Sequence, residues 1–294
     1  FTTTLAHINE VGGKVIELLK DEALELKSDN PVKGNIDIDK LVKAIEETGP
    51  KNVAFIRMEA STNLIGGQPF SIRNMMDVRQ VADKYGIMLV LDASLLGENA
   101  YLVKKREEQW KENSMADIIK MMTGLADLVY FSARKLTSSR GGGICTNNQK
   151  LYKQMEPLIP LFEGFLTYGG MSIREIEAMA VGIYETIDET MISQSVDFIK
   201  YCVESAVKAG IPMVTPPGVL GAHVNAGEFC SHIPQSEYPA GALAAAFYLC
   251  SGVRGMERGT MSSVRDENGA EIPADVELMR LAFPRRVFTL SQTK

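Results

Sequence analysis

Polar and charged side chains follow three apolar segments of the chain that are typical of buried strands. Asn63 follows the first segment, Asp92 ends the second, and Ser132 and Lys135 follow the third. Open parallel sheets bind ligands at the carboxyl ends of their strands. If the three strands are neighbours, an amide, a carboxylate, a hydroxyl and a primary amine converge on one edge of the sheet. We therefore predict a ligand site there.

The chemistry of this set indicates a cofactor that has an aldehyde and a basic ring nitrogen. Burial and a neighbouring cation both lower the pKa of a lysine and so prepare it to form an imine, and Arg134 precedes Lys135 directly. An aspartate at a strand end can pair with a protonated pyridine nitrogen, which makes pyridoxal phosphate an electron acceptor. Asp92 and Lys135 are thus candidates for binding pyridoxal phosphate.

Each residue also has a plain structural interpretation. An aspartate that ends a strand is often the N-cap of the next helix, which would give Asp92 a capping role. A lysine after a strand is most often exposed to solvent, so Lys135 alone is weak evidence. Glycines 141–143 lack the spacing of a dinucleotide-binding loop, and we expect them to permit a close backbone approach beneath Lys135.

The segments around these residues alternate between strand and helix patterns. Nearly continuous apolar runs predict strands covered on both faces, at 52–60, 86–94 and 126–133. Apolar residues at helical spacing predict helices at 38–49, 71–86 and 115–126. This alternation predicts an α/β fold with a mostly parallel sheet.

The last part of the chain has a different pattern. Helical spacing continues through 172–210, which predicts a long helix, whole or broken, that leads into a second domain. Shorter strand and helix segments follow, among them an alanine-rich helix at 239–250. We expect a large domain over 1–188, and a connecting helix with a smaller α+β domain over 189–294.

Composition narrows the classes of partner. The chain has 294 residues, of which 45% are hydrophobic, and a formal net charge of -6, which argues against nucleic acid and anionic membranes as partners. Its four cysteines are far apart and show no C-x-x-C spacing, so we expect neither a disulfide framework nor a metal site. No apolar run reaches the roughly 18 residues of a membrane span, and no signal peptide opens the chain. We expect a cytoplasmic protein that binds a small molecule.

Five segments carry a resemblance to a known family: NLIGGQPFS, DASLLGENAYLVKKRE, EGFLTYGGMSIREIEAMAVG, YPAGALAAAFYLCSGVRGMERG and RLAFPRRVFT. They resemble the β-eliminating lyases, the family of tyrosine phenol-lyase and tryptophanase, and the similarity spans the chain. It implies fold type I, the fold of the pyridoxal-phosphate-dependent transferases, with the cofactor on the large domain. It also implies a homo-oligomer, dimer or tetramer, in which subunits share active sites.

The resemblance implies which residues hold the cofactor. Lys135 matches the imine-forming lysine and Asp92 the partner of the pyridine nitrogen. Asn63 matches the amide at the cofactor's phenolic oxygen, and Phe1 the ring stacked on the pyridine. Ser132 matches a phosphate contact, and Arg134, where the family has a lysine, is placed with the same cofactor-binding group.

The resemblance also implies the substrate contacts. Arg280 matches the guanidinium that binds the substrate carboxylate, a bidentate task that suits arginine, and we expect Asn63 to contact the substrate as well. Thr2 matches a hydroxyl near the leaving group. Arg258 lies in an M-E-R-G segment that is similar to the form in tyrosine phenol-lyase, where the arginine faces the phenol. Lys135, Thr2 and Arg258 are therefore the expected catalytic residues.

The chain departs from the family pattern at several positions. Leu95 replaces an arginine that would hold the phenolic oxygen, and Leu220 replaces a histidine. Arg140 stands five residues after Lys135, where the family has an asparagine that binds potassium. Its charge would oppose a bound cation, or Arg140 points to solvent and the ion still binds through backbone carbonyl oxygens; both interpretations stay open. The resemblance further implies that segments before Phe1 and after Lys294 are absent from this chain.

The expected activity is that of a pyridoxal-phosphate-dependent β-elimination lyase, similar to tyrosine phenol-lyase. It would act on an aromatic or related L-amino acid and give pyruvate and ammonium. Indole or a thiol as the leaving group, as in tryptophanase or a cysteine-type β-lyase, stays open. Also open are an aminotransferase, which produces a second amino acid, and an inactive remnant that keeps the fold for subunit association.

Overall fold

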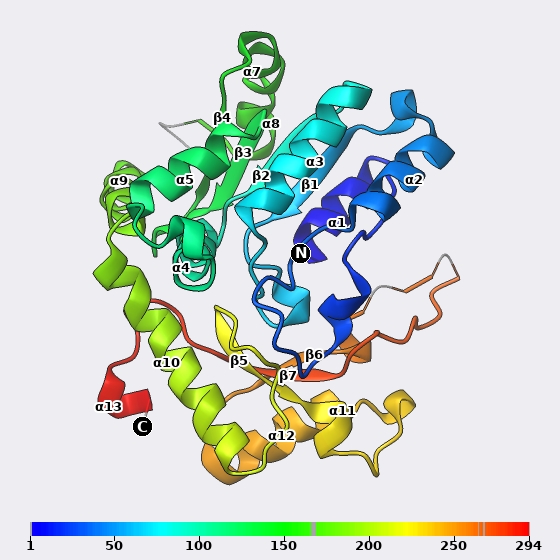
Figure 1. Cartoon of the computed structure of the whole chain (residues 1–294), viewed down its shortest axis with the longest axis vertical. Coiled ribbons are helices and arrows are strands. Elements are labelled where there is room, and N and C mark those ends of the chain that lie inside the picture. The colour runs from blue at the N-terminus through cyan, green and yellow to red at the C-terminus, as the bar shows by residue number, and fades with distance from the viewer. Residues whose placement is uncertain (1, 166–168, 264, 267, 294) are drawn as a thin grey trace. The chain divides into compact units, whose positions relative to one another are not determined.

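The computed structural model describes residues 2–165, 169–263, 265–266 and 268–293 of the chain (Figure 1). The chain divides into two compact units. The first unit comprises residues 1–20, 34–61 and 69–193, and the second comprises 21–33, 62–68 and 194–294. Among the helices in the described ranges, none combines the length and the apolar character needed to cross a membrane.

The first unit is built on a four-stranded sheet in the order β1-β2-β3-β4. Its strands are β1 (Phe55–Glu59), β2 (Met88–Asp92), β3 (Leu128–Ser132) and β4 (Gly142–Thr146). The first three strands are parallel, as predicted, and β4 is antiparallel to β3. Glu59 lies opposite Asp92, and Asp92 lies opposite Tyr130, so the carboxyl ends of β1, β2 and β3 are adjacent.

Helices with one apolar face cover this sheet. In α3 (Ile72–Tyr85), the Ser71 side chain accepts a hydrogen bond from the backbone of Asn74 at the start, and Gly86 ends the helix at φ 65°. Ile72, Met75 and Val78 of α3 are completely buried. The helix packs against β2 and contacts both α2 (Ile38–Thr48) and α5 (Met115–Gly124) (Figure 1).

The first unit contains six further helices in its described residues. They are α1 (Thr2–Glu10), α4 (Leu96–Arg106), α6 (Ala133–Leu136), α7 (Gln149–Met155), α8 (Leu158–Phe162) and α9 (Ile173–Thr186). Most of α4 is buried. Single 3-10 turns occur in both units, at Asp21–Leu24, Pro50–Asn52, Asn63–Ile65, Glu108–Trp110, Gln235–Glu237 and Thr260–Ser262.

The helical pattern predicted over 172–210 forms two helices, α9 and α10 (Glu189–Lys208). The break lies at residues 187–188, where the Asp188 carboxylate accepts a hydrogen bond from the backbone of Thr190 at 2.9 Å and so caps α10. Gly182 does not break α9. A Cβ atom at Gly182 would lie 2.3 Å from the carbonyl oxygen of Thr137, so the glycine permits the contact between α9 and the end of α6.

The second unit contains an antiparallel three-stranded sheet in the order β5-β7-β6. Its elements after α10 are β5 (Gly221–Asn225), α11 (Ala226–Phe229), α12 (Pro239–Ser251), β6 (Met256–Arg258), β7 (Leu278–Ala282) and α13 (Leu290–Thr293). The alanine-rich helix α12 packs on β6 and β7 (Figure 1). Apolar side chains from α10, β5 and β7 form a core, among them Ile199, Val203, Ala222, Val224 and Met279.

Candidate active site

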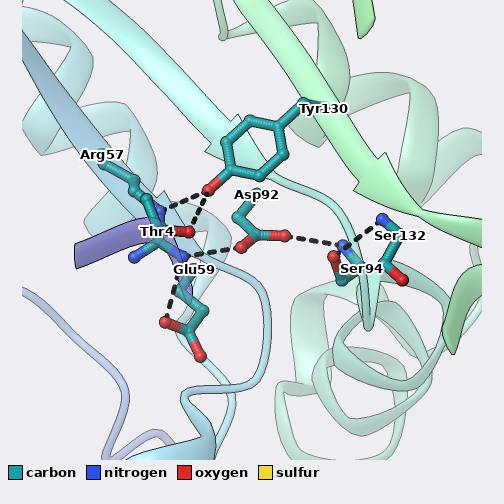
Figure 2. Close-up of polar contacts among 7 residues, drawn as sticks. All are labelled: Thr4, Arg57, Glu59, Asp92, Ser94, Tyr130 and Ser132. Carbon is teal, nitrogen blue, oxygen red and sulfur yellow. Dashed lines mark hydrogen bonds and ion pairs between the residues drawn. The ribbon is translucent and has the colours of Figure 1, made fainter. Parts of the chain in front are cut away.

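Asp92 is the last residue of β2, and its side chain is only 2% exposed. One carboxylate oxygen, Oδ1, accepts a hydrogen bond from the backbone of Ser94 at 3.0 Å. The other, Oδ2, lies 2.6 Å from Nη2 of Arg57 (Figure 2). The N-cap of the following helix is Leu95, so the capping interpretation of Asp92 is wrong. The carboxylate is instead held at the end of the strand as one half of a buried ion pair.

The register of the sheet explains how this ion pair forms. Glu59, Asp92 and Tyr130 lie side by side on three neighbouring strands. Arg57 is two residues before Glu59, and side chains two apart on a strand point to the same face. Arg57 therefore reaches all three residues, and Figure 2 shows dashed lines from its side chain to each of them.

Arg57 donates to three groups at once. Nη2 lies 3.2 Å from a Glu59 oxygen as well as 2.6 Å from Asp92, and Nε donates to the Tyr130 hydroxyl at 2.7 Å. Burial alone would lower the pKa of Arg57, but Glu59, Tyr130 and Asp92 outweigh burial and raise it. Arg57 is thus permanently charged. Arg57, Glu59 and Tyr130 were not predicted from the sequence; the available signal was two charges at alternate positions of the apolar segment FIRME.

Tyr130 extends the network to the first helix. Its hydroxyl lies 3.3 Å from Oγ1 of Thr4 in α1 (Figure 2). Burial, with the nearby charge of Asp92, raises the pKa of Tyr130, and Arg57 opposes this rise. The hydroxyl is therefore protonated at neutral pH and accepts a hydrogen bond from Nε of Arg57 at 2.7 Å.

Ser132 and Lys135 follow the end of β3. The backbone N–H of Ser132 donates to the Ser94 hydroxyl at 3.0 Å, and Ser94 in turn donates its own backbone N–H to Asp92 (Figure 2). The one-turn helix α6 begins directly after Ser132. It places Lys135 in a half-buried position and Arg134 in an exposed one. The structure thus brings Asp92 and Ser132 together, with Lys135 one turn beyond.

The glycines after α6 allow a strand to lie against β3. Gly142 and Gly143 begin β4, opposite Ser132 and Phe131. A Cβ atom on Gly142 would be 2.5 Å from the carbonyl oxygen of Phe131, and one on Gly143 would be 2.7 Å from the Phe131 ring. The predicted close approach is confirmed, but the partner is β3. The strand itself was not predicted, because glycine disfavours strands.

A second group of predicted residues lies in the second unit. Asn63 is 5% exposed, and its Oδ1 accepts a hydrogen bond from Nη1 of Arg280 at 2.9 Å. The two residues are 217 positions apart in the sequence, so local sequence patterns cannot predict this pairing. Asn63 and Arg280 were both predicted to bind the substrate, and the structure places them in direct contact.

Two further basic side chains lie near Arg280. It is paired across the sheet with His223 on β5, while Arg258 is at the end of the neighbouring strand β6. Burial and the charge of Arg258 lower the pKa of Arg280. Burial and the charge of Arg280 lower the pKa of His223 to about 3, so this imidazole is neutral. Within the described part of the chain, Nε of Arg258, Nε of Arg280 and Nε2 of His223 have no hydrogen-bond partner.

This basic group suits an anion such as a carboxylate, because two guanidinium groups still carry unpaired N–H donors among the described residues. His223 was not predicted from the sequence. Its only signal was a lone histidine inside the apolar segment GAHVN.

The predicted roles of Phe1, Thr2 and Arg140 stay predictions. Phe1 lies outside the described residues, and Thr2 begins α1 with a side chain that is also outside them. Arg140 is 76% exposed, and its Nε lies 4.0 Å from a Glu175 oxygen. The effect of Arg140 on potassium binding stays a prediction.

The residues of the first unit fit pyridoxal phosphate. Asp92 is held at the end of β2 with Oδ2 2.6 Å from Nη2 of Arg57, and a carboxylate at such a position is the partner of a protonated ring nitrogen. Lys135 supplies a primary amine for an aldehyde, and Ser132 and Arg134 supply a hydroxyl and a cation for a phosphate. Leu95, which stands where the family pattern has an arginine, is 1% exposed and belongs to the core.

Comparison with known proteins gives the family. The model of the beta-eliminating lyase family matches residues 1–293. The chain is 41% identical over 291 residues to tyrosine phenol-lyase of Pasteurella multocida, covering 98% of this chain and 64% of the relative. It is 38% identical over 291 residues to tyrosine phenol-lyase of Fusobacterium nucleatum, covering 98% of this chain and 63% of that relative. It is 36% identical over 292 residues to tryptophanase of Salinibacter ruber, covering 99% of this chain and 62% of that relative.

Solved structures agree on the fold. Bna3p of Saccharomyces cerevisiae matches with a TM-score of 0.67 at 17% identity, over 96% of this chain and 65% of that one. The SepCysS–SepCysE N-terminal domain complex matches with a TM-score of 0.58 at 13% identity, over 100% of this chain and 69% of that one. These matches confirm the fold class predicted from the sequence. The chain spans slightly less than two thirds of the length of its curated relatives, and by the family match over residues 1–293 it belongs to the β-eliminating lyases.

Proposed function

We propose that the protein is a pyridoxal-phosphate-dependent lyase that removes the β-substituent of an aromatic or related L-amino acid and gives pyruvate and ammonium. The observation that carries this proposal is the family match over residues 1–293. The first unit supports it, because Asp92 is held at the end of β2 and Lys135 follows the end of the neighbouring strand β3. The curated relatives carry the names tyrosine phenol-lyase and tryptophanase.

The residues of the first unit would hold the cofactor. When bound, pyridoxal phosphate supplies an electron sink for the charge left on Cα after deprotonation. The Asp92 carboxylate would pair with the protonated ring nitrogen, and the Ser132 hydroxyl and Arg134 would bind the phosphate. The resemblance further assigns Phe1 to stacking on the ring and Asn63 to the phenolic oxygen.

Lys135 would do the proton chemistry. Its amine would hold the cofactor at the aldehyde, and as a free amine Lys135 would be the base that accepts the Cα proton of the substrate. Arg280 would bind the α-carboxylate in a bidentate manner, oriented by its hydrogen bond to Asn63. Thr2 and Arg258 would act on the leaving group as it departs, as donors of hydrogen bonds.

The family match extends over both units and does not favour an aminotransferase or an inactive remnant. A cytoplasmic location, a homotetramer, and the division of roles between a cofactor-binding domain over 1–188 and a small domain over 189–294 are proposals that rest on the resemblance.

Labelling the lysine tests the proposal. We expect pyridoxal phosphate to give the purified protein a visible absorption band, and borohydride reduction to attach the cofactor to Lys135 on a peptide map. Lys135→Ala should abolish the band. Lys104→Ala is the matched control, because Lys104 is already paired with Glu189 at 2.6 Å and should not react. A label on any other lysine would show that the site is assigned wrongly.

A further inference from the structure

The Asp92 carboxylate already has a cation. Oδ2 lies 2.6 Å from Nη2 of Arg57, and Oδ1 accepts from the backbone of Ser94. Each carboxylate oxygen has a second lone pair, so one further donor can still be accepted. A protonated ring nitrogen that pairs with Asp92 would therefore join a carboxylate that an arginine has partly neutralised.

Arg57 is held firmly in this position. Its side chain is 19% exposed, and its three contacts come from three different strands, β1, β2 and β3. The Tyr130 hydroxyl fixes Nε, so the guanidinium cannot swing away from Asp92 without losing that bond. In a buried site, the repulsion between two cations at one carboxylate is screened far less than in water.

Glu59 opposes this effect. It lies 3.2 Å from the same Nη2 atom, and its side chain is 9% exposed. A second carboxylate on the same guanidinium nitrogen offsets part of the positive charge that Arg57 presents to Asp92. Arg57 and Glu59 thus act on the charge of Asp92 in opposite directions.

We propose that Arg57 is a positioning residue that shares the Asp92 carboxylate with the cofactor's ring nitrogen, and that it weakens this pairing while Glu59 strengthens it. This inference rests on the proposed function, because it takes the ring nitrogen as the ligand of Asp92. It assigns Arg57 a role through Asp92, without contact to the substrate.

A comparison of two cofactors isolates the ring nitrogen. Pyridoxal phosphate and its 1-deaza analogue, in which carbon replaces that nitrogen, are titrated into cofactor-free protein, and the ratio of the two dissociation constants is measured. Arg57→Gln should increase the preference for pyridoxal phosphate by about tenfold, the factor that corresponds to one pKa unit of the ring nitrogen. Arg57→Lys keeps the cation and should keep the wild-type preference.

Glu59→Gln gives a second measurement with the opposite sign. Without its carboxylate, more of the charge of Arg57 acts on Asp92, and the preference for pyridoxal phosphate should fall below the wild-type value. This variant keeps the inference testable if Arg57→Gln does not fold. Arg79→Gln is the matched control: Arg79 is 17% exposed and pairs with Asp83 and Asp127 instead, so its loss should leave the preference unchanged.

The results separate two kinds of failure. If wild-type protein forms the visible band but neither Arg57→Gln nor Glu59→Gln changes the preference, or if both change it in the same direction, the inference is wrong and the proposed function stands. Wild-type protein that binds neither compound would overturn both. Opposite shifts in the two variants, with Arg79→Gln unchanged, would support the role of Arg57.

Discussion

Lys33 is a buried lysine that the proposed chemistry does not use. It is 1% exposed, and its amine donates to the backbone carbonyl oxygens of Glu25 and Thr215, all within the second unit. Burial lowers the pKa of Lys33 from 10.5 to about 8, although the charge of Glu25 opposes this shift. The lysine ties the segment at 21–33 to the turn that precedes β5, and its charge is costly there.

The low pKa of Lys33 predicts a pH dependence of stability. Between pH 8 and pH 10.5, the unfolded chain holds a proton on this amine that the folded chain has released. The contribution of Lys33 to the free energy of unfolding therefore rises with pH through this window, by up to about 3 kcal/mol. Urea unfolding at several pH values measures this effect. The free energy of unfolding of wild type, relative to that of Lys33→Met, should rise by this amount between pH 8 and pH 10.5.

The control for Lys33 is Lys27→Met, which removes an amine that is 59% exposed and bound to Glu228. Its difference from wild type should not rise between pH 8 and pH 10.5. A constant difference between wild type and Lys33→Met over the same range would contradict the prediction.

Single residues were predictable from the sequence where a strand end marked them. Asp92 and Ser132 were predicted as site residues because each ends an apolar run, and in the structure Ser94 links the two through hydrogen bonds. Arg57 and Glu59 were missed because a charged residue inside an apolar run indicates a surface position when its cross-strand neighbours are unknown. Only the register with β2 shows that both face Asp92.

Elements were predictable where one pattern persisted. The three parallel strands and helices α2, α3 and α5 were all predicted, since apolar runs and helical spacing are local signals. Strand β4 was not, because its two glycines carry no side-chain pattern, and its pairing with β3 depends on a contact with Phe131. The sequence pattern also did not predict where α9 ends and α10 begins.

The turn that carries Asn63 depends on glycine. Gly67 has φ 71°, a left-handed conformation, and a Cβ atom there would lie 2.1 Å from the carbonyl oxygen of Val219. The backbone N–H of Val219 also donates to the Gly67 carbonyl at 2.9 Å. The residue thus fixes the segment at 62–68 against the chain that leads to β5.

Gly67→Ala should therefore destabilise the protein by more than about 1 kcal/mol, because strain at positive φ adds to a clash with backbone that cannot move aside. Thermal unfolding measures this loss. Gly86→Ala is the matched control: Gly86 also has a positive φ, 65°, but a Cβ atom there meets nothing within 4 Å. Equal losses in the two variants would show that the contact with Val219 has no energetic effect.

At the scale of the whole molecule, the chain crosses between its two units several times. Residues 62–68 belong to the second unit although they lie between β1 and α3 of the first. The backbone contacts of Gly67 with Val219 and the hydrogen bond from Arg280 to Asn63 hold them there. The predicted boundary after residue 188 took no account of such crossings, because contacts between distant segments leave no local pattern.

The basic side chains of the second unit predict which leaving group the whole protein favours. Arg258 is half-buried at the end of β6, its Nε has no hydrogen-bond partner in the described structure, and its charge depresses the pKa of Arg280. Such a guanidinium favours a leaving group that accepts a hydrogen bond through oxygen, as phenol does, over indole.

We therefore expect the purified protein to release phenol from tyrosine with a higher kcat/KM than indole from tryptophan. Arg258→Met should lower kcat/KM for tyrosine by about 10- to 100-fold, the range expected for a lost hydrogen bond to a charged donor, and should affect tryptophan much less. Arg254→Met, which removes an exposed arginine just before the same strand, is the control and should change neither value. A wild-type protein that prefers tryptophan would contradict the role of Arg258 and would point to indole as the natural leaving group.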